Sequence, residues 1–284
     1  MNNNIILEGG LGNRMRVAAA AYALSQRTGL SLRVLWTSQW GMRCRFDKLF
    51  RIVVGFPHFT LRDVRGFERM MFARPTLKNL HLPLLLQRLR YPRRIYAPQI
   101  WPLNQASFDY AAWFQQGDAL LTAYRDFHPW TSQDLRTIFQ PNDGVLHLVE
   151  ERCAAFANRT IGIHIRRTDH QQAINESPLE LFFEAIDRED PETIYLATDD
   201  EATKTAMRSR YGQRIITAVT QATRNNAEGI REALVEMLAL SRTSHIYGSA
   251  GSTFAPIAAC LGDIPITILQ RDGRGTVDLL CKTL

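Results

Sequence analysis

The second half of the sequence alternates short apolar segments with helical patterns, and this alternation limits the possible folds more than any other feature. The apolar segments lie at residues 161–165, 193–197, 214–217, 245–247 and 264–269. They are rich in β-branched and aromatic residues, as buried strands are. Between them, residues 228–242 repeat apolar residues at i, i+3, i+4 and i+7, and Ser177, Pro178 and Glu180 are typical of a capping box at a helix start. Strands that alternate with helices predict a parallel sheet with right-handed crossovers.

The first 40 residues contain one further unit of strand, helix and strand. Residues 4–8 and 32–36 are predicted strands, and residues 11–27 are a predicted helix that Gly29 ends. Between the first strand and the helix lies a glycine-rich turn, whose amides at a helix start favour anions. Its spacing is not GxGxxG, so the dinucleotide fingerprint is absent. The pattern is typical of a Rossmann-like unit, although tight turns also use glycine for geometry alone.

A chain of 284 residues permits one large domain or two ordinary ones. The Pro-Asn-Asp-Gly sequence at residues 141–144 is a turn signal, and we place the domain boundary there or in the helix that follows. The sequence therefore predicts an α/β protein with one Rossmann-like domain on either side of this turn.

Positive charge is concentrated in residues 43–94, which hold 13 Lys and Arg against 3 Asp and Glu, a net +10. The whole chain has a formal charge of +6, so the remaining residues carry −4. Such a region favours an anionic partner: nucleic acid, a lipid headgroup or a phosphorylated substrate. A GC-rich genome, which favours arginine codons, explains the composition as well, since 30 of the 34 basic residues are arginine.

Residues 81–94 mix leucines with four arginines, and two structures fit them. One is a basic segment at a membrane interface, and the other is a helix with a core-packed face and a solvated basic face. The sequence shows no signal peptide and no apolar run of transmembrane length, and its four cysteines are widely separated. We therefore expect a cytoplasmic protein, with peripheral contact at the inner membrane face through residues 43–94 as the alternative.

Three predicted strands end in polar clusters, at residues 164–169, 198–200 and 248–253. In open parallel sheets, ligands bind beyond the carboxyl ends of the strands, so the three clusters should share one rim. They offer arginines, carboxylates and a Gly-Ser-Thr turn at a helix start, a combination that suits a nucleoside diphosphate. Arg166 should share a strand face with His164 and meet the phosphate, whereas Arg167 should point away and be structural. The alternative is that these residues serve only as turns, helix caps and surface charge.

These clusters resemble the motifs of a known family. His164, Arg166, Arg167 and Asp169 match the HxRRxD motif of the GDP-fucose-dependent fucosyltransferases of the α1,2/α1,6/protein O-fucosyltransferase superfamily. Residues 195–200 and 228–254 resemble its second and third motifs, and residues 9–14 resemble its glycine turn. The chain is most similar to α1,6-fucosyltransferases of the Nod-factor type.

The resemblance implies a GT-B-like fold: two Rossmann-like domains with a cleft between them. Residues 1–150 would be the acceptor-side domain with its basic irregular insertion, and residues 151–284 the domain that binds the GDP-sugar. It implies an inverting, metal-independent glycosyltransferase that moves L-fucose from GDP-β-L-fucose to a glycan, with no cofactor. The partners would be the nucleotide-sugar donor and the glycan acceptor, and not nucleic acid.

The resemblance also assigns roles. Arg166 would contact the β-phosphate and stabilise the departing GDP, Ser252 and Thr253 would bind the same phosphates, and His164 would lie near the guanine or ribose. Glu236 stands where the family has an aspartate that holds guanosine. The other expected substrate-binding residues are Gly10, Gly12, Asn13, Arg14, Arg167, Asp169, Asp199, Asp200, Ser249 and Gly251. For Arg167 and Asp169, a structural pair that sets the loop is the alternative.

The catalytic base is the main departure from the family pattern. The lysine that follows the motif is replaced by His170, and the expected glutamate is missing at its spacing. Glu176 is close but displaced, and Glu8 resembles the acid proposed as base in one protein O-fucosyltransferase group. The alternative for both residues is surface charge or, for Glu176, helix-dipole stabilisation at a helix start.

Several functions fit these observations. The acceptor we expect is a bacterial surface polysaccharide or a lipid-linked oligosaccharide. The alternatives are a transferase of the same fold that uses another nucleotide sugar, and a non-catalytic protein that binds nucleotides or nucleic acid.

Overall fold

The computed structural model describes residues 2–38, 42–52, 54–73, 75–167, 171–218, 225–273 and 281–282. The chain forms two compact units. Unit 1 contains Met1–Asn142 with two later segments, Arg224–Ile230 and Leu280–Leu284, and unit 2 contains Asp143–Thr223 and Arg231–Leu279. The first passage between units lies within the predicted turn at residues 141–144 and not at residue 150.

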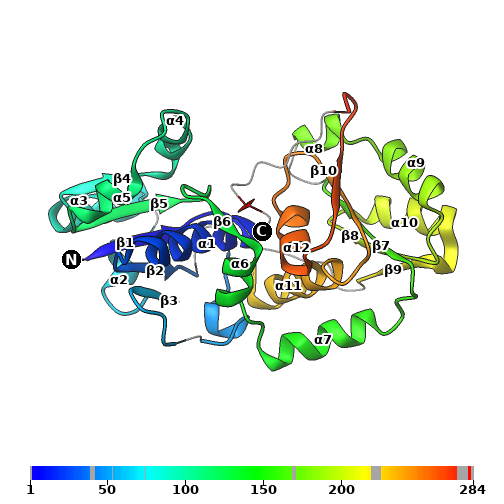
Figure 1. Ribbon diagram of the computed structural model, residues 1–284, viewed down its shortest axis with the longest axis horizontal. Helices are drawn as coiled ribbons and strands as arrows, with labels where there is room; N and C mark the ends of the chain where they lie inside the picture. Colours follow the sequence, from blue (N-terminus) through cyan, green and yellow to red (C-terminus); the bar gives the residue numbers. More distant parts are fainter. Residues whose placement is uncertain are drawn as a thin grey trace. The chain divides into compact units, whose positions relative to one another are not determined.

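Unit 1 is built on a five-stranded parallel sheet with the order β3-β2-β1-β5-β4 (Figure 1). The strands are β1 (Asn3–Leu7), β2 (Leu32–Trp36), β3 (Phe59–Asp63), β4 (Arg93–Ile95) and β5 (Ala119–Ala123). Helix α1 (Leu11–Thr28) follows β1 and is buried along most of its length, which its alanine-rich sequence permits. It ends at Gly29, whose φ of 71° is the left-handed conformation that glycine favours. The predicted strand, turn, helix and strand are all present.

The basic region expected to be irregular contains short elements. They are η1 (Phe46–Lys48), α2 (Glu68–Met71), η2 (Leu77–Asn79) and α3 (Leu82–Arg90). The next elements are η3 (Ala97–Gln99), α4 (Ile100–Gln105), α5 (Tyr110–Gln115), β6 (Trp130–Thr131) and α6 (Ser132–Ile138). Late in the chain, β12 (Cys281–Lys282) pairs with β6 in parallel.

Unit 2 holds the second five-stranded parallel sheet, with the order β11-β10-β7-β8-β9. Its strands are β7 (Thr160–Ile165), β8 (Thr193–Thr198), β9 (Ile215–Thr217), β10 (Ile246–Ser249) and β11 (Ile266–Leu269). Its helices are α7 (Asp143–Cys153), α8 (Gln171–Glu176), α9 (Leu179–Glu189), α10 (Glu201–Tyr211), η4 (Gly212–Arg214), α11 (Ala227–Leu240) and α12 (Phe254–Gly262). All five strands predicted from the alternation are present and parallel.

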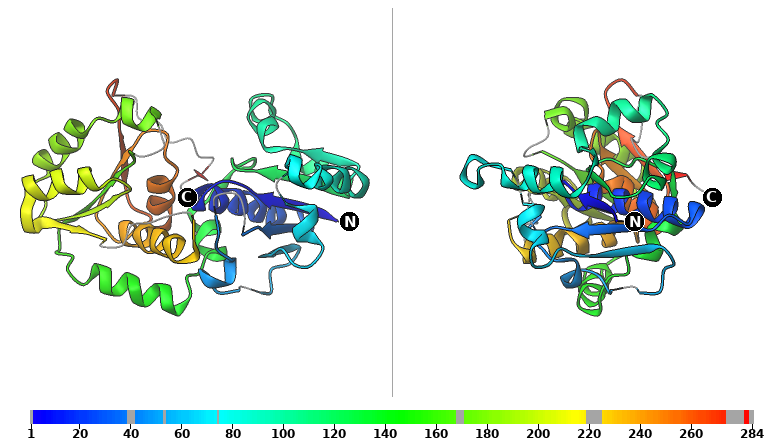
Figure 2. Two further views of the ribbon diagram at one scale, coloured as in Figure 1. Left: turned by 180° about the vertical axis from the view of Figure 1, so that it is seen from behind. Right: turned by 90° about the vertical axis from the view of Figure 1, so that its left-hand side faces the viewer.

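Helices cover both faces of this sheet (Figure 2). On one face, the odd-numbered isoleucines of β7 pack with Phe182 of α9 and Met207 of α10. On the other face, Gly162 and Gly248 leave no room for a side chain: an added Cβ would lie 2.9 Å from Leu240 Cδ2 and from Ala255 Cβ, respectively. These two glycines let the end of α11 and the start of α12 approach the strands closely, and the second contact places the start of α12 beside the end of β10.

The α/β fold class predicted from the sequence is confirmed, since each unit is a parallel sheet of Rossmann-like connectivity. The cleft expected between the two domains stays a prediction. Among the described residues, no helix combines the length and apolar character that crossing a bilayer requires.

Candidate functional site

The carboxyl ends of β7, β8 and β10 bring the predicted polar clusters to one rim of unit 2. In the register of the sheet, His164 lies beside Ala197 on one side and Gly248 on the other. The residues that follow these three positions therefore emerge next to one another. Two of these residues are Arg166, after β7, and Asp199, after β8. They form an ion pair with 3.2 Å between Arg166 Nε and Asp199 Oδ2.

Asp199 fixes the turn after β7 and holds Arg166 at the rim. Its second carboxylate oxygen accepts a hydrogen bond of 2.9 Å from the backbone N–H of Arg167. The side chains of Arg166 and Asp199 remain 21% and 16% exposed, so the guanidinium is oriented without being buried. A fixed, solvent-reachable arginine is well suited to binding phosphate.

Arg167 is structural, as its predicted orientation implied. Its guanidinium donates to the backbone oxygens of Ile174 (3.3 Å) and Ser177 (2.8 Å), at the end of α8. Burial lowers the pKa of its side chain, and nearby carboxylates oppose that effect. Asp169 and His170 lie outside the described residues, and the alternative pairing of Arg167 with Asp169 stays a prediction.

His164 contributes a buried, uncharged imidazole behind Arg166. Its ring stacks on Phe254 of α12, with 4.8 Å between centroids and 18° between planes. Burial lowers its pKa to about 4, and the positive charge of Arg166 acts in the same direction. Among the described residues, Nδ1 has no hydrogen-bond partner although it is buried. Such a nitrogen is costly unless a ligand or water satisfies it.

The turn between β10 and α12 contains one buried hydroxyl, which supports the fold, and two half-buried hydroxyls at the start of the helix. Ser249 is completely buried, accepts from the backbone N–H of Arg166 (3.1 Å) and donates to the backbone oxygen of His164 (3.4 Å). This structural role replaces its predicted contact with substrate. Gly251, with φ 68°, turns the chain, and Ser252 and Thr253 stay half-buried at the start of α12, where anions are favoured.

Asp200 has a structural role, and its predicted contact with substrate stays a prediction. It is the N-cap of α10, and its carboxylate accepts from the backbone N–H (2.8 Å) and hydroxyl (2.6 Å) of Thr203. These hydrogen bonds lower its pKa. A carboxylate so occupied caps a helix start and cannot reach a ribose hydroxyl with the same oxygen.

Glu236 is a buried carboxyl on α11. Burial raises its pKa to about 8, with Glu232 adding to the effect and Arg152 opposing it. Arg152 is already paired with Glu232 at 2.7 Å. Burial therefore favours the protonated carboxyl of Glu236, which can donate a hydrogen bond as well as accept one.

Sequence reasoning missed Ser177, which organises this rim. Its buried hydroxyl donates to the backbone oxygen of Leu269 (2.6 Å) and accepts from the backbone N–H of Ala250 (2.8 Å). The predicted capping box with Glu180 is wrong, because Pro178 is the N-cap of α9 and this hydroxyl is committed elsewhere. The adjacent Glu176 ends α8, and its carboxylate accepts from Gln270 Nε2 at 2.8 Å. Nothing in the sequence marks either tertiary contact.

In unit 1, the glycine turn after β1 starts α1 with Gly10 as N-cap and no side-chain cap. Gly9 has φ 77°, Gly12 is buried in the first turn and Asn13 is half-buried. Arg14 is completely buried and donates to the backbone oxygens of Gly9 and Thr37, and its Cζ lies 5.1 Å from the centre of the Trp36 ring. Burial lowers its pKa to about 9. Arg14 thus supports the fold of the turn in place of the predicted substrate contact.

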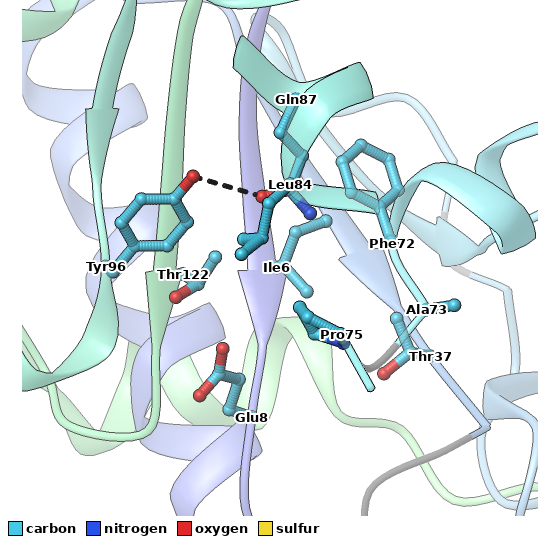
Figure 3. A pocket seen from close by; sticks show the side chains of 10 residues that line it. All are labelled: Ile6, Glu8, Thr37, Phe72, Ala73, Pro75, Leu84, Gln87, Tyr96 and Thr122. Atoms are coloured by element: carbon cyan, nitrogen blue, oxygen red, sulfur yellow. Dashed lines mark hydrogen bonds between the residues drawn. The ribbon is translucent and has the colours of Figure 1, made fainter. Parts of the chain in front are cut away.

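Glu8 lies at the end of β1, in a pocket of about 70 Å³ within unit 1 (Figure 3). Burial raises the pKa of its carboxyl, while a hydrogen bond with Thr122 and the charge of Arg14 act in the opposite direction. The pocket is largely apolar, with a few polar groups: its lining is Ile6, Glu8, Thr37, Phe72, Ala73, Pro75, Leu84, Gln87, Tyr96 and Thr122. A carboxyl with raised pKa in a pocket is a candidate proton acceptor.

The described residues contain no group of three or more His, Cys, Asp and Glu side chains placed to hold a metal ion. No family model matches the sequence. No curated protein matches it either.

Solved structures do match. The fucosyltransferase NodZ from Bradyrhizobium is 18% identical, with a TM-score of 0.67 over 98% of this chain and 99% of that one. NodZ α1,6-fucosyltransferase co-crystallised with GDP is 18% identical, with a TM-score of 0.66 over the same shares. POFUT1 in complex with GDP is 10% identical, with a TM-score of 0.56 over 94% of this chain and 98% of that one. These likenesses confirm the fold that the motif resemblance implied.

Proposed function

We propose that this protein is an inverting fucosyltransferase that transfers L-fucose from GDP-β-L-fucose to a glycan. The observation that carries the proposal is the rim of unit 2, where Asp199 holds Arg166 beside the neutral His164 and the start of α12. The chain shares its fold with NodZ, which was studied with GDP and soaked with GDP-fucose. The motif order and this fold point to the same donor.

Arg166 would act on the leaving group. As the bond between fucose and the β-phosphate breaks, negative charge grows on the phosphate, and a cation held in place stabilises that charge more than it stabilises the bound donor. The ion pair with Asp199 supplies the fixed orientation, because it uses Nε at 3.2 Å and leaves the side chain partly exposed. Ser252 and Thr253 at the start of α12 would donate to the same phosphates.

Glu8 is the base that we propose for the acceptor hydroxyl. The raised pKa of its carboxyl makes it a stronger proton acceptor than an exposed glutamate, and the surrounding pocket could exclude water from the hydroxyl. Glu176, the other predicted base, already accepts a hydrogen bond from Gln270, so we rank it second. The step forms the C–O bond to the acceptor, breaks the C–O bond to the β-phosphate and passes the hydroxyl proton to the carboxylate.

The acceptor that we propose is a bacterial surface polysaccharide or a lipid-linked oligosaccharide, and the proposed location is the cytoplasm, at the inner membrane face. We propose no metal ion or cofactor for the transfer. Membrane contact through residues 43–94 belongs to this proposal, and its surface is described in the next subsection.

The donor assignment is tested by thermal unfolding with GDP, GDP-fucose, GDP-mannose and a UDP-sugar, followed by product analysis with GDP-fucose. A ligand at about 100 times its dissociation constant adds about 2.7 kcal/mol of stability, so the correct donor should raise Tm measurably. We expect GDP and GDP-fucose each to raise the Tm of the protein. A shift with the UDP-sugar alone would favour the transferase with another donor, and a GDP shift without transfer would favour the non-catalytic alternative.

A further inference from the structure

The segment between β3 and β4 exposes an unusual number of apolar side chains. Leu77, Leu80 and Leu89 are 83%, 88% and 77% exposed. We call the exposed apolar residues of this segment the leucine surface: Phe67, Met70, Leu77, Leu80, Leu82, Leu85 and Leu89. A contiguous stretch of chain that presents seven such residues to solvent marks a contact surface more often than an isolated exposed leucine does.

Helix α3 is apolar on two faces, and only one of them is used by the fold. Leu86 packs against the core of unit 1, and the buried Gln87 donates to the backbone oxygen of Met71 at 2.9 Å. Leu82, Leu85 and Leu89 follow the i, i+3, i+7 spacing of a second face, which is exposed. The helix therefore packs on the core, as one of the two structures predicted for residues 81–94 has it, and it also presents leucines outward. The predicted contact of this segment with a membrane interface stays a prediction.

The turn that leads into α3 is held in a strained conformation. Leu80 and His81 both have φ of 51°, a left-handed conformation that residues other than glycine rarely adopt. The backbone N–H groups of Leu80 and His81 hold this turn by bonding to Leu77 O and Thr76 O, both at 3.1 Å. Leu80 is thus an apolar side chain that is exposed to solvent and held in a backbone conformation that leucine does not favour.

The charge of the same region selects an anionic partner. Its three carboxylates are all paired with arginines of the region: Glu68 pairs with Arg62 at 2.6 Å, and Asp47 and Asp63 both pair with Arg45. The exposed cations of the leucine-surface segment are Arg65, Arg69, Lys78, Arg88 and Arg90. The leucines are thus accompanied by arginine and lysine without exposed opposing charge from the same segment.

We propose that the leucine surface and its cations bind the interface of an anionic lipid bilayer. The apolar side chains would enter the boundary between headgroups and acyl chains, and the cations would meet the anionic headgroups. A bilayer fits better than a folded protein partner, because outward leucines interspersed with flexible cations need no complementary shape. The inference narrows the membrane contact of the proposed function to α2, η2 and α3.

The position of α3 links this surface to the acceptor side. The same helix sends Leu84 and Gln87 toward the pocket that contains Glu8 (Figure 3). A bilayer bound by the outer face of α3 would therefore lie one helix away from that pocket. This link rests on the proposed function and favours a lipid-linked glycan as its acceptor, whereas membrane binding itself does not depend on the donor.

Flotation of the full chain with vesicles tests the proposal. We expect the protein to float with vesicles of phosphatidylcholine and phosphatidylglycerol, at least about tenfold less with phosphatidylcholine alone, and less as salt rises. The double variant Leu80→Asp/Leu89→Asp should lose at least about tenfold in vesicle affinity. The matched control is Ile52→Asp/Val54→Asp, which places the same two charges on residues that are 57% and 83% exposed but lie before β3.

Equal flotation of wild type and double variant would overturn the proposal, as would failure to float with either vesicle or equal binding to both. Because the two leucines are exposed, the double variant should keep the wild-type Tm and the wild-type response of Tm to GDP. These two measurements serve as the control that the variant is folded. If GDP fails to bind the wild type while flotation succeeds, the donor assignment falls and the membrane surface stands.

Discussion

Each unit places an arginine just after the central strand of its sheet, and the two arginines have opposite surroundings. Arg14 follows β1 and is completely buried, with backbone oxygens of Gly9 and Thr37 as acceptors and Trp36 beneath it. Arg166 follows β7 and stays 21% exposed, held by Asp199. The comparison shows that the fold decides the role of such an arginine: one stabilises a turn, and the other is presented at a rim.

The carboxylates near these two arginines, Glu8 in unit 1 and Asp199 after β8 in unit 2, differ in the reverse sense. In unit 1, Glu8 lies in an apolar pocket, and burial raises its pKa. In unit 2, Asp199 is paired with Arg166 and with a backbone N–H. Unit 1 thus presents a basic carboxylate and unit 2 an oriented cation, which are the two groups that an inverting transfer from a nucleotide sugar uses.

The sharpest test of this division is Glu8→Gln, because removal of a general base costs about 10²–10⁴-fold in rate. Only the carboxylate accepts a proton, so wild-type kcat/KM should fall as pH falls through the raised pKa of Glu8, and the variant should lack that limb. The contribution of Glu8 to the free energy of unfolding should instead rise as pH falls through the same range. The reason is that the raised pKa makes the folded state bind this proton more tightly than the unfolded state does. An unchanged pH–rate profile in the variant would remove Glu8 from the reaction.

Arg166→Ala should lower kcat by about 10²–10³-fold while changing the free energy of unfolding by less than about 1 kcal/mol. The loss should appear in turnover of GDP-fucose and in the Tm shift with GDP. The matched control is Arg214→Ala, which removes a more exposed arginine of unit 2 that pairs with Asp190 at 3.1 Å. Full turnover in Arg166→Ala would contradict the proposed donor site.

Arg14→Met should do the opposite, with a loss of about 2–5 kcal/mol in the free energy of unfolding, because buried backbone oxygens lose their donor. Urea denaturation measures this loss, and GDP affinity at a temperature where the variant is folded should be close to that of the wild type. Arg27→Met, at a side chain that is 45% exposed, should cost little. If Arg14→Met left stability intact and weakened GDP, the two arginines would share a role.

Ser177→Ala should lower the free energy of unfolding by about 1–3 kcal/mol, because Leu269 O and the N–H of Ala250 each lose a buried partner. Since Ala250 lies in the turn before α12, GDP affinity should weaken as well. Ser252→Ala would lower GDP affinity without this loss of stability. Denaturation and GDP titration of both variants separate support of the turn from contact with the phosphates.

The strands and the division between Arg166 and Arg167 could be predicted from the sequence because they depend on local periodicity. Alternation along β7 fixes which side chain joins His164 on its face and which points away. Ser249 and Asp200 could not be assigned, because a hydroxyl or carboxylate at a strand end looks the same in sequence whether it binds a ligand or caps the backbone. Ser177 depends on contacts with Leu269 and Ala250, far away in the chain, which no local pattern encodes.

The pairing of β12 with β6 has a consequence for how the protein is made. Ser132, next to β6, and Cys281 of β12 lie 149 positions apart in the sequence, with their Oγ and Sγ atoms 3.8 Å from each other. A ribosome adds about 5–20 residues per second, so roughly 7 to 30 seconds pass between the synthesis of β6 and that of its partner strand, and all of unit 2 is synthesised in that time. Unit 1 therefore begins first and is completed last, and a nascent chain stalled before β12 should be more sensitive to protease near β6 than the released protein.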